Sequence, residues 1–152
     1  MTKIYLAAPL FTLAEQNFNA ELARFLESEG FEVFLPQEHE PRRNTAKSIF
    51  DMDVAALDWA DMVVACMDGP DPDSGTAWEC GYAHAKGKPI VCFRTDFRIS
   101  GDTKGAPYNL MLTESATARV EVPFRTKTAD FRKRLLAQIR KALRPRGKSK
   151  RR

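Results

Sequence analysis

An uninterrupted apolar run at Met62–Met67 restricts the fold of this chain more than any other feature. A strand that is apolar at every position is typical of a parallel sheet with both faces covered by helices. Four other apolar segments have strand length, at Lys3–Ala8, Phe31–Leu35, Ile90–Phe93 and about Ala118–Val122. The sequence therefore predicts five strands in one buried sheet.

Segments with helical periodicity separate these strands. Thr12, with Glu15 three residues later, forms a capping-box signature, and its helix is expected to end at Glu29, before Gly30. Further helices are expected at roughly Lys47–Trp59, Gly75–Lys86 and Thr128–Leu143, and Gln37–Asn44 is expected to be a loop. This alternation predicts an α/β fold with a doubly wound parallel sheet and helices on both faces.

The length of 152 residues fits a single domain. We expect this domain to span residues 1–143 and the basic segment 144–152 to be a disordered tail. Doubly wound sheets bind ligands at the carboxyl ends of their strands, so the loops that follow the strands are the candidates for a site. These loops are Ala8–Phe11, Pro36–Asn44, Asp68–Ser74 and Arg94–Asn109.

Several classes of protein are excluded by composition and motifs. No apolar run approaches the ~18 residues of a membrane span, and Ile4–Leu10 is interpreted as a first strand rather than a signal peptide. Neither GxGxxG nor a P-loop signature is present. Three cysteines and two histidines occur without metal-ligand spacing, so we expect no metal and no cofactor. The same pattern indicates a reducing cytoplasm.

The charge of the chain is concentrated at one end. Residues 125–152 hold 13 basic residues and one acidic residue, whereas residues 1–124 hold 11 basic and 19 acidic residues. The body of the chain therefore does not have the charge of a nucleic-acid binder, and we expect nucleic acid not to be a partner.

Two carboxylates in the segment Asp71–Tyr82 could carry chemistry. Glu79 falls about one turn into a predicted helix, whose dipole favours the ionised form, and Asp73 lies just before that helix. Glycosyl transfer needs such a pair, because one group attacks the anomeric carbon while protonation helps the leaving group depart. A plainer interpretation stays open, in which Asp73 or Ser74 only caps the helix and Glu79 is solvated.

Other candidate residues lie on or near the same loops. Tyr5 lies on the first strand, Phe11 follows it, and Gln37 follows the second strand. Asp51 and Asp53 are two residues apart on one predicted helix, and therefore face different sides. Three aromatic residues are expected in the core rather than in a base-stacking platform: Phe50, Trp59 and Trp78.

Four motifs occur in a specific order along the chain. They are Lys3–Phe11 (KIYLAAPLF), Asp53 eight residues before Asp61, Asp73–Glu79 (DSGTAWE) and Asn109–Met111 (NLM). Together they resemble the nucleoside 2-deoxyribosyltransferase family, over residues 3 to about 125. The resemblance implies a flavodoxin-like, five-stranded parallel sheet.

The resemblance also implies roles for individual residues. Glu79 matches the nucleophile that forms a covalent deoxyribosyl-enzyme, and Tyr5 matches the tyrosine that orients it. Asp73 matches the acid that holds the sugar hydroxyl, and Asp53 the acid that contacts the base and assists its protonation. Further substrate contacts are expected from Phe11, Gln37, Gly75, Asn109 and Met111. The last two match residues lent to a neighbouring subunit, which implies a homo-oligomer.

The implied reaction is transfer of 2-deoxyribose between purine or pyrimidine bases, with retention, in nucleoside salvage. Hydrolysis of 2-deoxynucleosides or their 5′-monophosphates is the alternative, because related N-hydrolases share the fold and the glutamate. Asp73 would repel a phosphate dianion, which favours unphosphorylated substrates. The intact set of Tyr5, Asp73 and Glu79 argues against a non-catalytic nucleoside sensor. Base preference, oligomer number and the exclusion of ribose stay open.

Overall fold

The computed structural model describes residues 1–39 and 45–144, and it contains a five-stranded parallel sheet in the order β2-β1-β3-β4-β5. The strands are β1 (Lys3–Ala7), β2 (Glu32–Phe34), β3 (Met62–Cys66), β4 (Ile90–Arg94) and β5 (Ala118–Glu121). The helices are α1 (Leu13–Ser28), α2 (Pro36–His39), α3 (Ala46–Trp59), α4 (Ser74–Ala85), α5 (Leu110–Ser115) and α6 (Thr128–Ala142). The expected flavodoxin-like fold is confirmed. No helix within these two ranges is long and apolar enough to cross a membrane.

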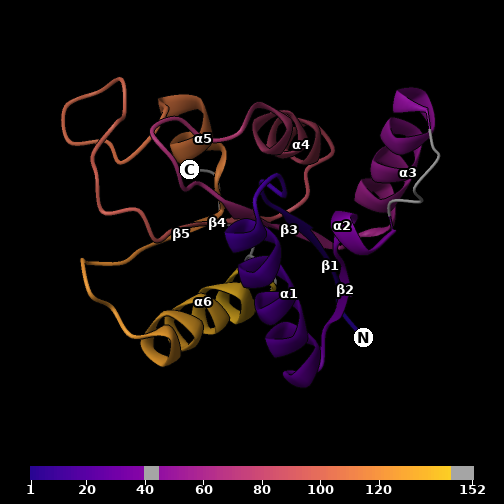
Figure 1. Ribbon diagram of the computed structural model, residues 1–152, viewed down its shortest axis with the longest axis horizontal. Helices are drawn as coiled ribbons and strands as arrows, with labels where there is room; N and C mark the ends of the chain where they lie inside the picture. The colour runs from indigo at the N-terminus through magenta and orange to yellow at the C-terminus, as the bar shows by residue number, and fades with distance from the viewer. Residues whose placement is uncertain (40–44, 145–152) are drawn as a thin grey trace, which may run out of the picture.

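Helices cover both faces of the sheet (Figure 1). α1 and α6 pack on one face, and α3, α4 and α5 lie on the other. Consecutive residues of β1 consequently enter different cores. Ile4 and Leu6 pack with α1 and α6, whereas Tyr5 and Ala7 pack on the side of α3 and α4. β1 therefore contributes to both cores, and Tyr5 faces the helices that follow β2 and β3.

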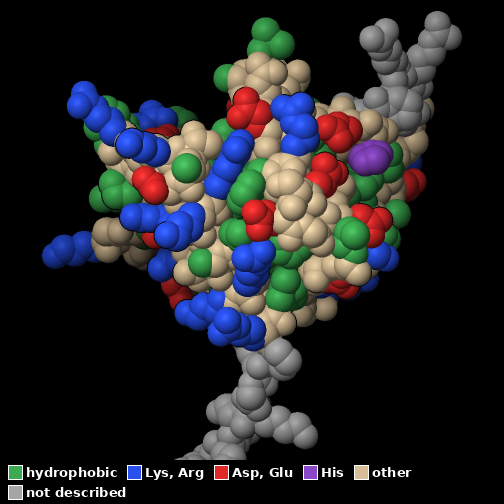
Figure 2. Space-filling model, turned by 90° about the horizontal axis from the view of Figure 1, so that it is seen from below, with side chains coloured by type: hydrophobic (Ala, Val, Ile, Leu, Met, Phe, Trp, Pro, Cys, Tyr) green, Lys and Arg blue, Asp and Glu red, His purple; other side chains and the backbone are tan. Residues whose placement is uncertain are grey.

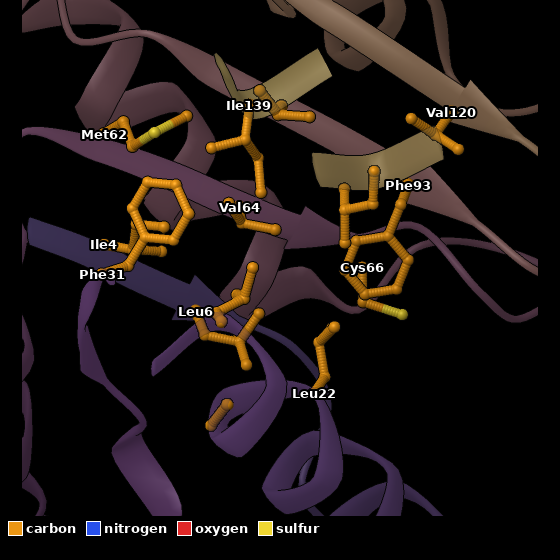
Figure 3. Close-up of a cluster of buried hydrophobic side chains, with 14 of the residues drawn as sticks. Ile4, Leu6, Leu22, Phe31, Met62, Val64, Cys66, Phe93, Val120 and Ile139 are labelled. Carbon is orange, nitrogen blue, oxygen red and sulfur yellow. The ribbon is translucent and has the colours of Figure 1, made fainter. Parts of the chain in front are cut away.

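The core beneath α1 and α6 is closed by apolar side chains from both helices (Figure 3). Leu22 of α1 and Ile139 of α6 gather there with strand residues such as Leu6 and Val64, and all four are almost completely buried. Burial of this kind stabilises a fold by about 1.5–3 kcal/mol per large side chain. The last helix is therefore part of the domain rather than an appendage.

The outer side of α6 carries much of the basic charge. Figure 2 shows this face, with Lys and Arg side chains gathered over one half of it. Two ion pairs join α6 to α1, between Arg132 and Glu21 at 3.5 Å and between Arg140 and Glu29 at 2.9 Å. Since exposed pairs contribute at most about 1 kcal/mol each, apolar packing rather than charge holds the helix in place.

The start of α1 agrees with the expected capping box. The Thr12 hydroxyl accepts a 3.2 Å hydrogen bond from the backbone of Glu15, and the Glu15 carboxylate accepts one of 2.8 Å from the backbone of Thr12. The helix ends at Ser28, and Gly30 beyond it has a φ of +91°, a conformation that favours glycine. Both ends lie within about a residue of their expected positions.

Two short helices were not expected from the sequence. α2 occupies the start of the expected loop at Gln37–Asn44, and α5 follows Asn109, whose side chain caps it by accepting from the backbone of Met111. Helices of four and six residues are too short to show apolar periodicity. The rest of the expected loop, residues 40–44, and nearly all of the expected tail, residues 145–152, lie outside the described residues.

The strand order changes direction between β1 and β3. β2 lies on one side of β1, whereas β3, β4 and β5 follow on the other. In open α/β sheets, ligands bind at such a reversal, in the crevice at the carboxyl ends of the strands. The loops that leave β1 and β3, and the helices that follow them, are thus placed to form a site.

Replacement of Leu135 by Ala should destabilise the protein by about 2–5 kcal/mol, because Leu135 is fully buried on α6 and its loss leaves a cavity. Urea unfolding followed by circular dichroism measures the difference. The matched control is Lys133→Ala on the exposed side of the same helix, which should change stability by less than about 0.5 kcal/mol. Equal unfolding midpoints for the two variants would contradict the packing of α6 described above.

Candidate active site

A pocket of about 490 Å³ opens between α3 and α4. Its described lining is mainly apolar, and two carboxylates face it. The lining residues are Ala46, Ile49, Phe50, Asp53, Val54, Gly75, Trp78 and Glu79. Three residues that the sequence places in the site, Asp53, Gly75 and Glu79, thus come together here from two helices.

A hydrogen bond ties Glu79 to the sheet. Glu79 lies in the second turn of α4, and Oε1 of its carboxylate accepts a 2.6 Å bond from the hydroxyl of Tyr5 on β1. Tyr5 is fully buried, and its ring stacks on Phe34 of β2 with the ring centroids 5.6 Å apart. The Glu79 carboxylate is therefore positioned by a side chain that is itself immobilised by the core.

The surroundings of Glu79 change its ionisation. Burial has the largest effect and raises the pKa of the carboxyl group, while the hydrogen bond from Tyr5 lowers the pKa and the charges of Asp53 and Asp73 raise it. The resulting pKa is about 7. Burial therefore outweighs the expected stabilisation of the ionised form by the helix dipole, and both forms are populated near neutral pH. The pKa of Tyr5 is raised by burial and by Glu79, so the phenol stays a donor.

Asp73 lies at the N-cap of α4. Its Oδ2 accepts a 2.9 Å hydrogen bond from the backbone N–H of Thr76, so Asp73 caps the helix as the plainer interpretation expects. A Cβ added at Gly75 would lie only 3.1 Å from the same oxygen, and glycine therefore leaves room for the capping carboxylate. The capping role coexists with proximity to Glu79, since the charge of Asp73 raises the pKa of Glu79.

The two aspartates of α3 lie in different surroundings, as their spacing predicts. Asp53 lines the pocket and acts electrostatically on both Glu79 and Tyr5. Asp51 is exposed and pairs with Lys47, one turn earlier on the helix. Of the two, Asp53 is the residue placed to act on a molecule in the pocket.

Gln37 and Phe11 are not among the described residues that line this pocket. The amide nitrogen of Gln37 donates to the backbone oxygen of Gln16 at 2.9 Å, and its amide oxygen accepts from Asn19 at 3.1 Å. Gln37 thus joins α2 to α1. The side chain of Phe11 is exposed at the start of the segment leading into α1.

Asn109 and Met111 lie on a different cavity. This cavity measures about 700 Å³ and lies between α4 and α5, on another side of α4 from Glu79. Asn109 caps α5 and donates to Asp102 at 3.0 Å, while 71% of Met111 is exposed. The fold therefore does not bring these two residues to the Glu79 pocket of the same chain.

Two aromatic residues occupy positions that the sequence did not predict. Phe50 and Trp78 are 47% and 48% exposed and line the pocket, so the expectation that they belong to the core is wrong. Trp59 is half-buried and does pack against the core beneath α3 and α4. Trp78 and Glu79 lie three and four residues after Gly75, and these helical spacings signal that each shares a face with Gly75.

Within the described residues, no group of three or more His, Cys, Asp or Glu side chains could hold a metal ion. The titratable groups of the site are the carboxylates of Asp53 and Glu79 at the pocket and the Tyr5 phenol that bonds Glu79. A carboxylate held at a pocket wall can attack an electrophilic carbon, and a second carboxyl group nearby can carry a proton.

Comparison with known sequences identifies relatives. Residues 4–111 match the family described as nucleoside 2-deoxyribosyltransferase. The uncharacterized protein C191.05c of Schizosaccharomyces pombe is 39% identical over 67 residues, which cover 41% of this chain and 32% of that protein. The matched segment thus spans about a third of the length of this relative.

Solved structures share the fold over most of both chains. A conserved protein from Enterococcus faecalis is 28% identical with a TM-score of 0.72, covering 91% of this chain and 99% of the other. The 2-deoxyribosyltransferase from Bacillus psychrosaccharolyticus is 29% identical with a TM-score of 0.65, covering 86% and 96%. The CMP N-glycosidase BcmB from Clostridium botulinum, at 21% identity and a TM-score of 0.63 over 90% and 99%, is similar in fold alone.

Replacement of Glu79 by Gln should stabilise the protein more at pH 8 than at pH 5. The pKa of Glu79 is raised in the folded state, so folded chains hold its proton between pH 4.5 and about 7 while unfolded chains release it. Wild-type stability therefore falls across this range, by on the order of 2 kcal/mol, and a neutral amide removes that loss. Urea unfolding of both proteins at the two pH values measures it, and a pH-independent difference would contradict the raised pKa.

Proposed function

The chain belongs to the nucleoside 2-deoxyribosyltransferase family, and we propose that it transfers a 2-deoxyribosyl group between nucleobases, with Glu79 as the nucleophile. The observation that carries this proposal is the 2.6 Å bond from buried Tyr5 to Glu79, at the wall of a pocket shared with Asp53. The similarity to the 2-deoxyribosyltransferase of Bacillus psychrosaccharolyticus supports it.

The proposed reaction has two half-reactions. In the first, a carboxylate oxygen of Glu79 attacks C1′ of a deoxynucleoside, the bond from C1′ to the base breaks, and its electron pair leaves with the base. The base takes a proton from Asp53, and the sugar remains as an ester of Glu79. In the second, a nitrogen of the incoming base attacks C1′, Glu79 leaves as a carboxylate, and Asp53 recovers the proton. Two inversions at C1′ give net retention.

Tyr5 is proposed to orient the nucleophile. Its bond engages Oε1, which leaves Oε2 as the oxygen that attacks. The bond also lowers the pKa of Glu79 and so increases the ionised fraction that can act as a nucleophile. A rigid donor is suited to this role, because it does not have to reorganise when the carboxylate reacts.

Asp73 is proposed to accept a hydrogen bond from a hydroxyl of the deoxyribose. Its place at the start of α4, close enough to act on the pKa of Glu79, puts an acceptor beside the attacking group. A 5′-phosphate would meet this negative charge, so the proposed substrates are unphosphorylated deoxynucleosides and free bases. Gln37 and Phe11, in the segments after β2 and β1, remain proposed substrate contacts.

The proposed assembly is a homo-oligomer in which Asn109 and Met111 complete the site of a neighbouring subunit. Their position away from the Glu79 pocket of their own chain, together with the exposure of Met111, supports this arrangement. The proposed setting is deoxynucleoside salvage in a reducing cytoplasm. All three cysteines are buried as free thiols, which supports a reducing compartment.

Incubation of the protein with thymidine and adenine should yield deoxyadenosine and thymine, separated by chromatography. Glu79→Gln should lower kcat by several orders of magnitude, because an amide is a poor nucleophile. Mass spectrometry of the quenched wild type should show a deoxyribosyl adduct on the peptide that contains Glu79. Asp51→Asn, on the exposed side of α3, is the matched control and should keep its activity.

Two results would contradict the proposal. Near-wild-type turnover by Glu79→Gln would exclude this residue as the nucleophile. Release of thymine and free deoxyribose, with no deoxyadenosine at any adenine concentration, would assign the protein to the hydrolytic alternative.

Replacement of Tyr5 by Phe should move the pH profile of kcat/KM to higher pH. In the wild type kcat/KM should rise with pH through a midpoint near 7, as Glu79 loses its proton. Loss of the Tyr5 hydrogen bond removes the influence that lowers this pKa, so the midpoint should rise. Tyr82→Phe is the control, since the Tyr82 hydroxyl bonds Asp58 instead, and its midpoint should not change. An unshifted midpoint in Tyr5→Phe would show that the bond does not tune Glu79.

A further inference from the structure

We propose that the outer side of α6 and a pair of phenylalanines beside its start form a surface that binds single-stranded nucleic acid. This inference is independent of the proposed function. The expectation against a nucleic-acid partner rested on residues 1–124, which hold more acidic than basic residues. The structure adds that the basic residues of the following segment are not spread over this acidic body, because Lys and Arg gather over one half of the face that α6 occupies (Figure 2).

The basic side chains of α6 and its flanks lie away from the sheet. Phe131, Leu135 and Ile139 are buried on the inner side of the helix, and the basic positions fall on the rest of its circumference. We call the following exposed residues the basic face: Arg125, Lys127, Lys133, Arg134, Lys141 and Arg144. Asp130 is the only acidic residue in the sequence from Arg125 to the end of the chain, so one sign of charge dominates this side.

The charge of the basic face is not neutralised by the part of the chain that the structure describes. Arg132 and Arg140 pair with carboxylates of α1, but no residue of the basic face forms an ion pair with a described carboxylate. Unpaired cations gathered on one side favour a polyanion, because each phosphate that they neutralise releases counterions from the nucleic acid. Three of the six are arginines, whose guanidinium groups can bind phosphate through two hydrogen bonds at once.

Two exposed aromatic rings lie beside the start of the basic face. Phe97 and Phe124 are 61% and 65% exposed, and their ring centroids are 4.9 Å apart with the planes at 53°. The guanidinium of Arg125 lies 5.2 Å from the centroid of the Phe124 ring. These three residues line a hollow of about 190 Å³ together with Thr128, the first residue of α6. Exposed rings next to unpaired cations suit a single strand, because its bases stack on the rings while its phosphates meet the cations.

The same geometry disfavours two other polyanionic partners. A helix that binds in a membrane surface exposes an apolar side, whereas the apolar side of α6 is buried in the core. The bases of a duplex are already stacked on one another and cannot cover Phe97 and Phe124. The proposed partner is therefore a single strand, bound with little preference for sequence, because every base has a π face.

Salt dependence tests the basic face. The full-length protein should bind a labelled oligothymidine in a fluorescence anisotropy titration, and the affinity should fall more than about tenfold between about 50 and 200 mM salt. Lys133→Gln combined with Lys141→Gln should reduce the slope of log K against log salt by about 1.4, since each phosphate contact contributes about 0.7. The matched control is Lys47→Gln combined with Lys86→Gln, which removes the same charge on the opposite face of the sheet and should keep the wild-type slope. Equal slopes for the two double variants would overturn the inference.

The aromatic pair is tested by a comparison with heparin, a polyanion without bases. Phe124→Ala should weaken the binding of oligothymidine at least about fivefold, while the salt concentration at which the protein elutes from heparin should not change. Phe50→Ala is the matched control, because Phe50 is an exposed ring on the opposite face of the sheet, and both readouts should stay at wild-type values.

Three results would overturn the inference. No anisotropy change at protein concentrations up to about 100 μM in low salt would exclude a nucleic-acid surface. Unchanged oligothymidine binding by Phe124→Ala, or an equal loss on heparin, would reduce the interaction to charge alone. Binding to phosphatidylglycerol vesicles without binding to oligothymidine would assign the basic face to a membrane instead. Oligothymidine binding that depends on both Lys133 and Phe124 supports the inference, whether or not the protein transfers deoxyribose.

Discussion

The hydrogen bond between the hydroxyl of Tyr5 and Oε1 of Glu79 is the contact on which the arrangement of the site depends, because it joins β1 to the helix that faces the pocket. Tyr5 can make it only because the alternation along β1 turns this residue toward α3 and α4, while Ile4 and Leu6 enter the opposite core. A shift of one residue in the register of β1 would move the phenol to the wrong face. The packing of α1 and α6 thus contributes to the site indirectly, by holding that register.

This contact is part of an unfavourable electrostatic arrangement. Glu79 is buried near the carboxylates of Asp53 and Asp73, and only the Tyr5 bond among the major influences favours its charge. Natural sites commonly sacrifice stability for reactivity in this manner. Burial raises the pKa of Glu79 to about 7, and the same desolvation would favour its proposed role as a nucleophile. The apolar lining of the pocket therefore both raises the free-energy cost of ionising Glu79 and favours its proposed reactivity.

The sequence predicts the fold well where patterns are long and local. The apolar run of β3 and the capping box of α1 are complete within a few residues, so no tertiary knowledge is needed to read them. The exposure of Phe50 and Trp78, in contrast, is not predicted from such patterns. Their residue type favours burial, and their exposure follows from how α3 and α4 meet, which a periodicity does not reveal. The raised pKa of Glu79 does not follow from the sequence for the same reason, because burial is a property of the packed pocket.

The helix α4 borders three environments at once. Thr76, Cys80 and Ala83 are buried toward the core. Gly75, Trp78 and Glu79 line the pocket with α3. Ala77, Gly81 and His84 line the cavity with α5. A Cβ added at Gly81 would meet no described atom within 4 Å, so packing within the chain does not require glycine there. This third side borders the cavity that Asn109 and Met111 line, which is where the proposed neighbouring subunit would make contact. The proposed oligomer contact and the proposed nucleophile would therefore lie on different sides of the same helix.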